Sequence, residues 1–135
     1  MKLHHLFTIN IFFAIYFGLT GSLFPQLWLV PYGLAPSDTA IWAVRLAGGS
    51  ILGFATLMWY GRTRASQESR RAIALALMVQ DIVGTVASFW LQLQGTVNAL
   101  GWSNVVGYLV LAIGYAYFVF FRPVASEQKG QFHEA

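Results

Sequence analysis

The sequence predicts an all-α fold, an integral membrane bundle of four helices with both termini on the cytoplasmic side. Apolar residues make up 57% of the 135 residues and charged residues 10%, whereas soluble proteins average about 45–50% and about 25%. Four apolar runs are each long enough to cross a bilayer, which takes roughly 20 residues. Lysine and arginine lie almost entirely on one side of these runs. The length suits one domain.

The predicted spans are residues 6–24, 41–60, 72–91 and 103–121. The first run follows Lys2, as in a signal peptide, but it leads into Phe24-Pro25 rather than a small-residue cleavage site, so we expect it to be retained. Residues 1–124 are therefore expected to form a single transmembrane domain. The polar segment 125–135 is expected to be a disordered tail.

The connections between the spans differ in character. Segment 25–40 cannot be helical throughout because it contains three prolines, Pro25, Pro31 and Pro36. Ser37 is the predicted N-cap of the second span, and Asp38 lies in its first turn at the positive end of the helix dipole. We interpret segment 61–71 as a solvated turn in which Ser66 begins the third helix early.

Orientation follows from the positions of the basic residues. Seven of the eight flank the spans: Lys2, Arg62, Arg64, Arg70, Arg71, Arg122 and Lys129. Four spans place all seven on one side, while the opposite connections, 25–40 and 92–102, contain no lysine or arginine. Because short basic loops stay in the cytoplasm, both termini are predicted to be cytoplasmic.

Two ionisable residues are predicted to lie at membrane depth. A charge at the bilayer centre costs about 2.5–3.5 kcal/mol, so Asp81, near the middle of its span, is a functional candidate. Arg45 lies about 7 Å below the outer end of its span at 1.5 Å per residue, close enough to extend to the headgroups. A direct salt bridge, a bridged contact and no link all stay open. We favour a neutral Asp81, because the side chains lean in opposite directions along the two helices.

Each span carries one polar or small face. In the third span this stripe is Asp81, Gly84, Thr85, Ser88 and Gln92, and the opposite face is Val79, Ile82, Val86, Phe89 and Leu93. The candidate polar site inside the membrane consists of Arg45, Gln80, Asp81, Thr85, Ser88, Asn104, Tyr108 and Tyr115. Two interpretations stay open, a hydrogen-bonded bundle interior and a polar cavity that binds a molecule.

Glycines mark the predicted helix contacts. They are Gly48, Gly49, Gly53, Gly84, Gly107 and Gly114. Gly49 and Gly53 match the GxxxG pattern, which is typical of packing within a bundle or of dimerisation, and we favour packing within the bundle. Arg45 shares its face with Gly48, Gly49, Leu52 and Thr56, so this face is expected to point inward. We therefore expect Gly49→Leu to be more damaging than Ile51→Leu.

No catalytic, cofactor or metal motif is found in the sequence. There is no cysteine, and the three histidines, His4, His5 and His133, lie outside the predicted spans. No phosphate-binding loop and no serine–histidine pair are recognisable. We expect no cofactor, no metal and no nucleic-acid partner. The arginine cluster in segment 61–71 is a topology signal that also attracts anionic lipid, by up to about 1 kcal/mol per basic residue.

Three short stretches carry a resemblance to a known group. They are Leu23-Phe24-Pro25, Arg45-Leu46-Ala47-Gly48-Gly49 and Tyr60-Gly61-Arg62. Together with the four-span arrangement, residues 6–122 resemble the DoxX-like small four-helix bacterial membrane proteins. The resemblance implies a multi-pass protein of the bacterial cytoplasmic membrane. Members of this group have diverse roles, some linked to oxidoreductase complexes, and the resemblance carries over no catalytic residue.

Three functions stay open. The leading hypothesis is a non-enzymatic bundle that binds lipid or belongs to a larger membrane protein complex or homo-oligomer. The second is a small proton-coupled transporter or channel-like protein that uses Asp81. The third is a membrane-embedded enzyme in which Asp81 is the acid or base and Tyr108 or Tyr115 donates a proton.

The predicted sidedness is open to cysteine labelling, because the chain has no cysteine of its own. With an impermeant thiol reagent, Ser126→Cys should be labelled only after the membrane is opened, since the C-terminal tail is predicted to be cytoplasmic. Thr96→Cys, in the connection without basic residues, should be labelled in intact cells. The reverse pattern would contradict the assigned topology.

Overall fold

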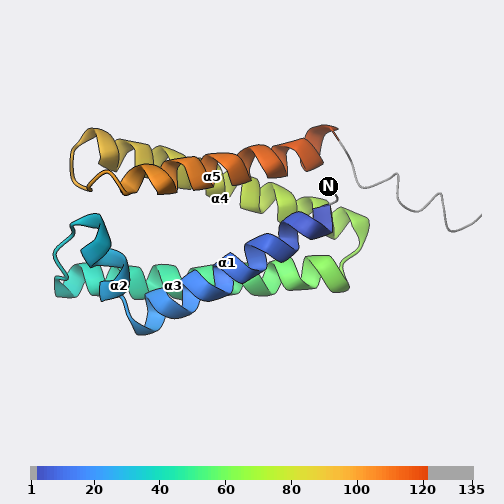
Figure 1. The fold of residues 1–135 in the computed structure, drawn as a ribbon. Helices are drawn as coiled ribbons and strands as arrows, with labels where there is room; N and C mark the ends of the chain where they lie inside the picture. The colour runs from blue at the N-terminus through green and yellow to red at the C-terminus, as the bar shows by residue number, and fades with distance from the viewer. Residues whose placement is uncertain (1–2, 122–135) are drawn as a thin grey trace, which may run out of the picture.

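The computed structural model describes residues 3–121 and shows an all-α chain (Figure 1). Its long helices are α1 (Leu3–Leu23), α3 (Asp38–Thr63), α4 (Gln67–Leu93) and α5 (Gly101–Ala116). The short elements are α2 (Gln26–Leu29), the 3-10 turn η1 (Val30–Tyr32) and the π-helical turn η2 (Tyr117–Phe121). Residues 1–2 and 122–135 lie outside the described part, including the predicted tail and the basic residues Lys2, Arg122 and Lys129.

All four predicted spans are confirmed as helices long and apolar enough to cross a membrane, with α5 and η2 together forming the fourth. All four are longer than predicted, most of all α3 and α4, because both extend into the segment expected to be a solvated turn. Only Arg64–Ser66 separates the two helices. The protein is thus a small multi-pass membrane protein.

Serine caps start the two middle helices, as predicted. The Ser37 hydroxyl accepts a hydrogen bond from the Ala40 amide at 3.3 Å, and the Ser66 hydroxyl accepts one from the Ser69 amide at 3.2 Å. Each cap satisfies an amide that has no partner within the helix. Gly33 ends η1 with φ 79°, a left-handed conformation that favours glycine.

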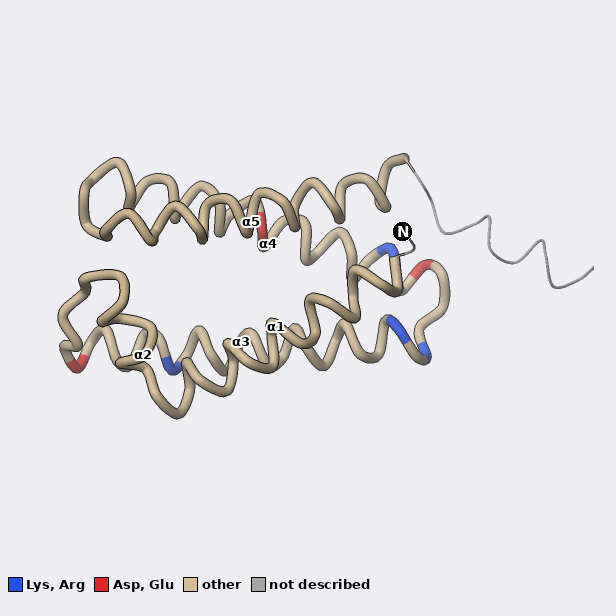
Figure 2. Tube along the Cα trace, viewed as in Figure 1, with Lys and Arg blue, Asp and Glu red and all other residues tan. Residues whose placement is uncertain are grey.

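The helices form two hairpins. In the first, α1 packs along α3, and in the second, α4 packs along α5 (Figure 1). Contact between α3 and α4 is much less extensive. We name the two ends of the bundle by their residues. The basic end carries Arg62, Arg64, Arg70 and Arg71 (Figure 2), and the loop end carries residues 24–37 and 94–100. Assignment of the basic end to the cytoplasm stays a prediction.

The first hairpin is held together by close contact between the backbones of α1 and α3. A Cβ atom on Gly48 would lie 2.8 Å from the Gly18 carbonyl oxygen and 2.7 Å from the Ser22 amide nitrogen. Both atoms belong to the backbone and cannot rotate away. The close approach of α1 and α3 therefore depends on the missing side chain at Gly48, as in other small-residue helix contacts in membranes.

The neighbouring glycines behave differently. A Cβ atom on Gly49 or Gly53 would meet nothing within 4 Å, and both residues are exposed. The structure therefore does not show the predicted packing of this GxxxG pattern within the bundle. Ile51, which we expected to tolerate change better, is half-buried against the core. The rotation of α3 about its axis accounts for the difference, since α1 contacts the Gly48 side.

The main core lies toward the basic end. Its buried members are Leu3, Leu6, Phe7, Ala14, Ala55, Met58, Ala74, Leu77, Met78, Tyr115, Phe118 and Val119. They come from the first half of α1 and α4 and from the last part of α3, α5 and η2. The two hairpins are therefore packed together by apolar side chains in this half of the molecule.

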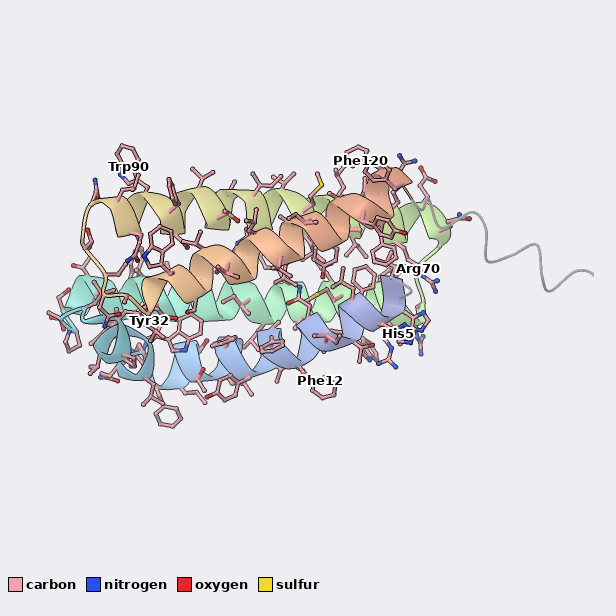
Figure 3. The ribbon with its side chains drawn as sticks, turned by 45° about the horizontal axis from the view of Figure 1, so that its top comes forward. His5, Phe12, Tyr32, Arg70, Trp90 and Phe120 are labelled. Carbon is pink, nitrogen blue, oxygen red and sulfur yellow. The ribbon has the colours of Figure 1, made fainter. Side chains whose placement is uncertain are left out.

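Hydrogen bonds join the hairpins at the loop end. The Asn98 side-chain amide donates to the Pro31 carbonyl at 2.7 Å, and the Asn98 backbone amide donates to the Tyr32 carbonyl at 3.1 Å. The Tyr32 hydroxyl donates to Oδ1 of Asn104 at 3.1 Å. Figure 3 shows Tyr32 at this end and Arg70 at the other. The connection predicted to be irregular thus links one hairpin to the other.

Two adjacent glycines of α3 provide a matched test of this fold. Gly48→Ala should destabilise the protein by about 1–3 kcal/mol, because the added methyl group overlaps the α1 backbone. Gly49→Ala should change stability by less than about 0.5 kcal/mol, because its methyl group meets open space. Thermal unfolding in detergent compares the two variants. Equal losses of stability in the two variants would contradict the α1–α3 contact at Gly48.

Candidate intramembrane polar site

The hydroxyl of Tyr115 joins three helices in the bundle interior. Tyr115, from α5, is 0% exposed. Its hydroxyl oxygen accepts a hydrogen bond from Nδ2 of Asn10 in α1 at 2.8 Å, and the hydroxyl donates to Sδ of Met58 in α3 at 3.5 Å. A polar group inside a bundle needs such partners, since lipid offers none.

The remaining long helix, α4, contributes Asp81 to the same region. Its side chain is 5% exposed, and it is the buried charged residue of the described chain. It lies within electrostatic reach of the Tyr108 and Tyr115 hydroxyls. Oδ2 of Asp81 is buried and has no hydrogen-bond partner within residues 3–121. One oxygen of an intramembrane carboxyl is thus available to a further group.

The polar stripe of α4 points inward, as predicted. Asp81 is buried and the rest of the stripe, Gly84, Thr85, Ser88 and Gln92, is half-buried. All five residues of the opposite face are exposed, from 44% for Phe89 to 64% for Val86. The Thr85 hydroxyl donates to the Asp81 backbone carbonyl at 2.7 Å. This bond holds the Thr85 hydroxyl one helical turn from Asp81.

Tyr108 covers the glycine of this stripe. A Cβ atom on Gly84 would lie 2.9 Å from Cδ1 of Tyr108, so the aromatic ring rests on bare α4 backbone. Gly114 packs less tightly, with a Cβ atom there 3.3 Å from Leu6. Gly107 has open space around it. Of the glycines predicted for helix contacts, Gly48, Gly84 and Gly114 have neighbours within the chain.

The predicted site residues do not form a single cluster. Asp81, Thr85, Ser88, Tyr108 and Tyr115 lie on the facing sides of α4 and α5. Three others lie elsewhere: Gln80 is exposed, Asn104 belongs to the loop-end hydrogen bonds, and Arg45 is exposed on α3.

Arg45 and Asp81 do not form a direct salt bridge. Oδ2 of the carboxyl has no hydrogen-bond partner within the described chain, and Arg45 lies on an exposed face. The expectation that the whole Arg45 face points inward is corrected, because Arg45, Gly49 and Thr56 are exposed, whereas Gly48 is buried and Leu52 half-buried. Packing of α1 on the Gly48 side turns this face away from the interior.

Sequence reasoning missed several structural partners. No pattern in the sequence indicates Met58, Gly18 or a partner for Asn10. The only local signal for Asn10 is an amide within an apolar run. Its acceptor lies 105 residues away. Asn98 and Tyr32 were likewise assigned no contact, because their pairing depends on how two separate connections meet.

Comparison with known proteins finds no match: no protein-family model fits the chain, and no curated protein or solved structure is significantly similar. The resemblance to the DoxX-like group therefore stays a prediction. Within residues 3–121, no group of three or more His, Cys, Asp or Glu residues is arranged to hold a metal ion. The structure itself supports a small four-span membrane protein.

The Tyr115 hydrogen bond makes a measurable prediction. Tyr115→Phe should lower stability by about 0.5–2 kcal/mol, because the half-buried Asn10 amide loses its acceptor. A double-mutant cycle with Asn10→Ala, followed by thermal unfolding in detergent, should show a coupling energy of similar size. Tyr16→Phe is the control, since Tyr16 is 63% exposed. Strictly additive losses would contradict the hydrogen bond.

Proposed function

We propose that this is a non-enzymatic membrane protein that binds an anionic phospholipid on the outer face of α3. This outer face consists of Trp42, Arg45, Gly49, Gly53, Thr56 and Tyr60, all of them exposed. The observation that carries the proposal is the exposed Arg45 above two glycines in open space. A cation at membrane depth that is not paired with Asp81 calls for an anion from outside the chain.

Position and geometry favour a phosphate as that anion. Arg45 is seven residues after the start of α3, or about 10 Å along the helix at 1.5 Å per residue. Helical side chains lean toward the helix N-terminus, so this side chain leans toward the loop end and its headgroups. A guanidinium group binds phosphate oxygens through two parallel hydrogen bonds.

The glycines support a lipid at the same place. Gly49 and Gly53 are one turn apart and leave a strip of bare backbone, with nothing within 4 Å of either Cβ position. An acyl chain that hangs from a phosphate at Arg45 would pass along this strip. Trp42 and Tyr60, near the two ends of the face, are residues typical of membrane interfaces.

Two other roles compete with this proposal. A transmembrane helix of a larger complex, or a second copy, would use the same strip, because GxxxG surfaces also bind helices. A small proton-coupled transporter or channel-like protein built on Asp81 is favoured by its unpaired oxygen. The first alternative competes for the outer face of α3, and the second concerns the bundle interior.

Native mass spectrometry with added phosphatidylglycerol tests the lipid proposal. Arg45→Gln should weaken phosphatidylglycerol binding about tenfold, which corresponds to about 1.4 kcal/mol. Arg62→Gln removes the same charge at the basic end of the same helix and should have a much smaller effect. Phosphatidylcholine binding should change little in both variants. Equal effects of the two substitutions would indicate only nonspecific attraction between basic residues and anionic lipid. That result would contradict a lipid site at Arg45.

Gly53→Leu separates lipid from helix docking. It should weaken phosphatidylglycerol binding without changing the mass of the protein assembly, because the side chain fills the strip. Release of a second copy or another protein upon this substitution would instead identify a helix as the occupant and overturn the lipid assignment.

A further inference from the structure

The inward face of α4 changes character at Asp81. Toward the basic end, Ala74, Leu77 and Met78 are apolar and buried. Toward the loop end, Thr85, Ser88 and Gln92 are polar and half-buried. The carboxyl lies at the boundary between a closely packed apolar segment and a polar stripe. Water thus finds hydrogen-bond partners along the loop-end half of this helix face, but not along Ala74, Leu77 and Met78 in the other half.

Three buried polar side-chain atoms of α4 have no partner in the described chain: Nε of Arg70, Oδ2 of Asp81 and Oε1 of Gln92. Arg70 lies in the first turns of α4 at the basic end, and the buried apolar residues Ala74 and Leu77 separate it from Asp81. Asp81 and Gln92 are eleven residues apart, or about 16 Å along the helix at 1.5 Å per residue. Buried polar atoms are almost always hydrogen-bonded, and ordered water is the usual partner when the protein supplies none.

The spacing of the side chains between them suits bridging water. Asp81, Thr85, Ser88 and Gln92 follow one another at intervals of four, three and four residues, which correspond to about 4.5–6 Å of rise. A water molecule that bonds two oxygens at about 2.8 Å each spans about 5.5 Å. Single waters can therefore link each polar side chain to the next.

We propose that water enters the bundle at the loop end, follows the polar stripe of α4 and reaches Asp81, while the basic end stays closed to it. The site is a one-sided water path that ends at an intramembrane carboxyl. It is independent of the lipid proposal, because it lies between the helices rather than on the outer face of α3.

The closed side is built by all four helices. Leu6 and Phe7 from α1 are 7% and 1% exposed, and Met58 from α3 is 1% exposed. Phe118 and Val119 of η2 are 5% and 3% exposed. Apolar interiors packed in this way exclude water, because they offer no hydrogen-bond partners and leave few voids of its size.

The groups that face Asp81 decide what the path can do. From α5 these are the titratable hydroxyls of Tyr108 and Tyr115. Near Tyr115, α1 presents the neutral Asn10 and α3 presents the neutral Met58, while Arg45 lies on the exposed side of α3. The carboxyl therefore exchanges its proton through the water path with the loop end only.

Single cysteines in this cysteine-free chain test the path. Ser88→Cys and Ala74→Cys place small thiols on the same inward face of α4, on the two sides of Asp81. Val86→Cys places a thiol on the opposite face, which is exposed toward lipid. In lipid vesicles, a charged, membrane-impermeant thiol reagent should label Ser88→Cys at least tenfold faster than the other two. Labelling should occur from the side that labels Thr96→Cys, and its rate is measured by mass spectrometry.

Each failure has a distinct meaning. Labelling of Ser88→Cys as slow as that of Val86→Cys would show that the stripe is dry. Labelling of Ala74→Cys as fast as that of Ser88→Cys would show that the basic end is open. Either result overturns the one-sided path, whatever the outcome for phosphatidylglycerol.

Infrared spectroscopy of the unsubstituted chain provides a second measurement, free of cysteine effects on folding. At acidic pH, where the carboxyl carries its proton, its C=O band is identified by its loss in Asp81→Asn. Transfer to D₂O should shift this band within the mixing time, because water reaches the group. A band that stays unshifted for hours would overturn the proposal.

Discussion

The buried hydroxyl of Tyr115 is the contact on which the arrangement of the two hairpins depends. It accepts from Asn10 and donates to Met58, so one hydroxyl joins α5 to both helices of the other hairpin. Because hydrocarbon offers no hydrogen-bond partners, separating the hairpins would leave these groups unsatisfied. Asp81 lies within electrostatic reach of the same residue and places the polar face of α4 there too.

The two ends of the bundle are held by different forces. Near the basic end, apolar side chains from all four spans pack around Tyr115. At the loop end, the link is a set of hydrogen bonds from Asn98 and Tyr32. An apolar core excludes water, whereas a polar link leaves half-buried polar side chains near the surface. This asymmetry is the physical basis of the one-sided path proposed for Asp81.

Arg45 and Asp81 illustrate how one membrane domain can carry two separate charged positions. Arg45 lies on the exposed side of α3, and Asp81 is buried between the helices. Since they do not neutralise each other, each needs its own compensation. In the lipid proposal a phosphate compensates the arginine from outside, and in the water-path proposal water or a bound proton compensates the carboxyl from within. The lipid and water-path proposals follow from this separation, and each can fail alone.

The sequence by itself determined the four spans, the serine caps and the inward stripe of α4. The length of an apolar run decides whether a helix can span the membrane, and a serine cap acts within one helical turn. The inward stripe of α4 was predictable because the opposite face of this helix is wholly apolar. The rotation of α3 was not determined, because Gly48 and Gly49 are adjacent and equally small. Only the contact with Gly18 decides which of them faces α1. The pairing of Asn10 with Tyr115 likewise depends on tertiary structure, because no local pattern relates residues 105 positions apart.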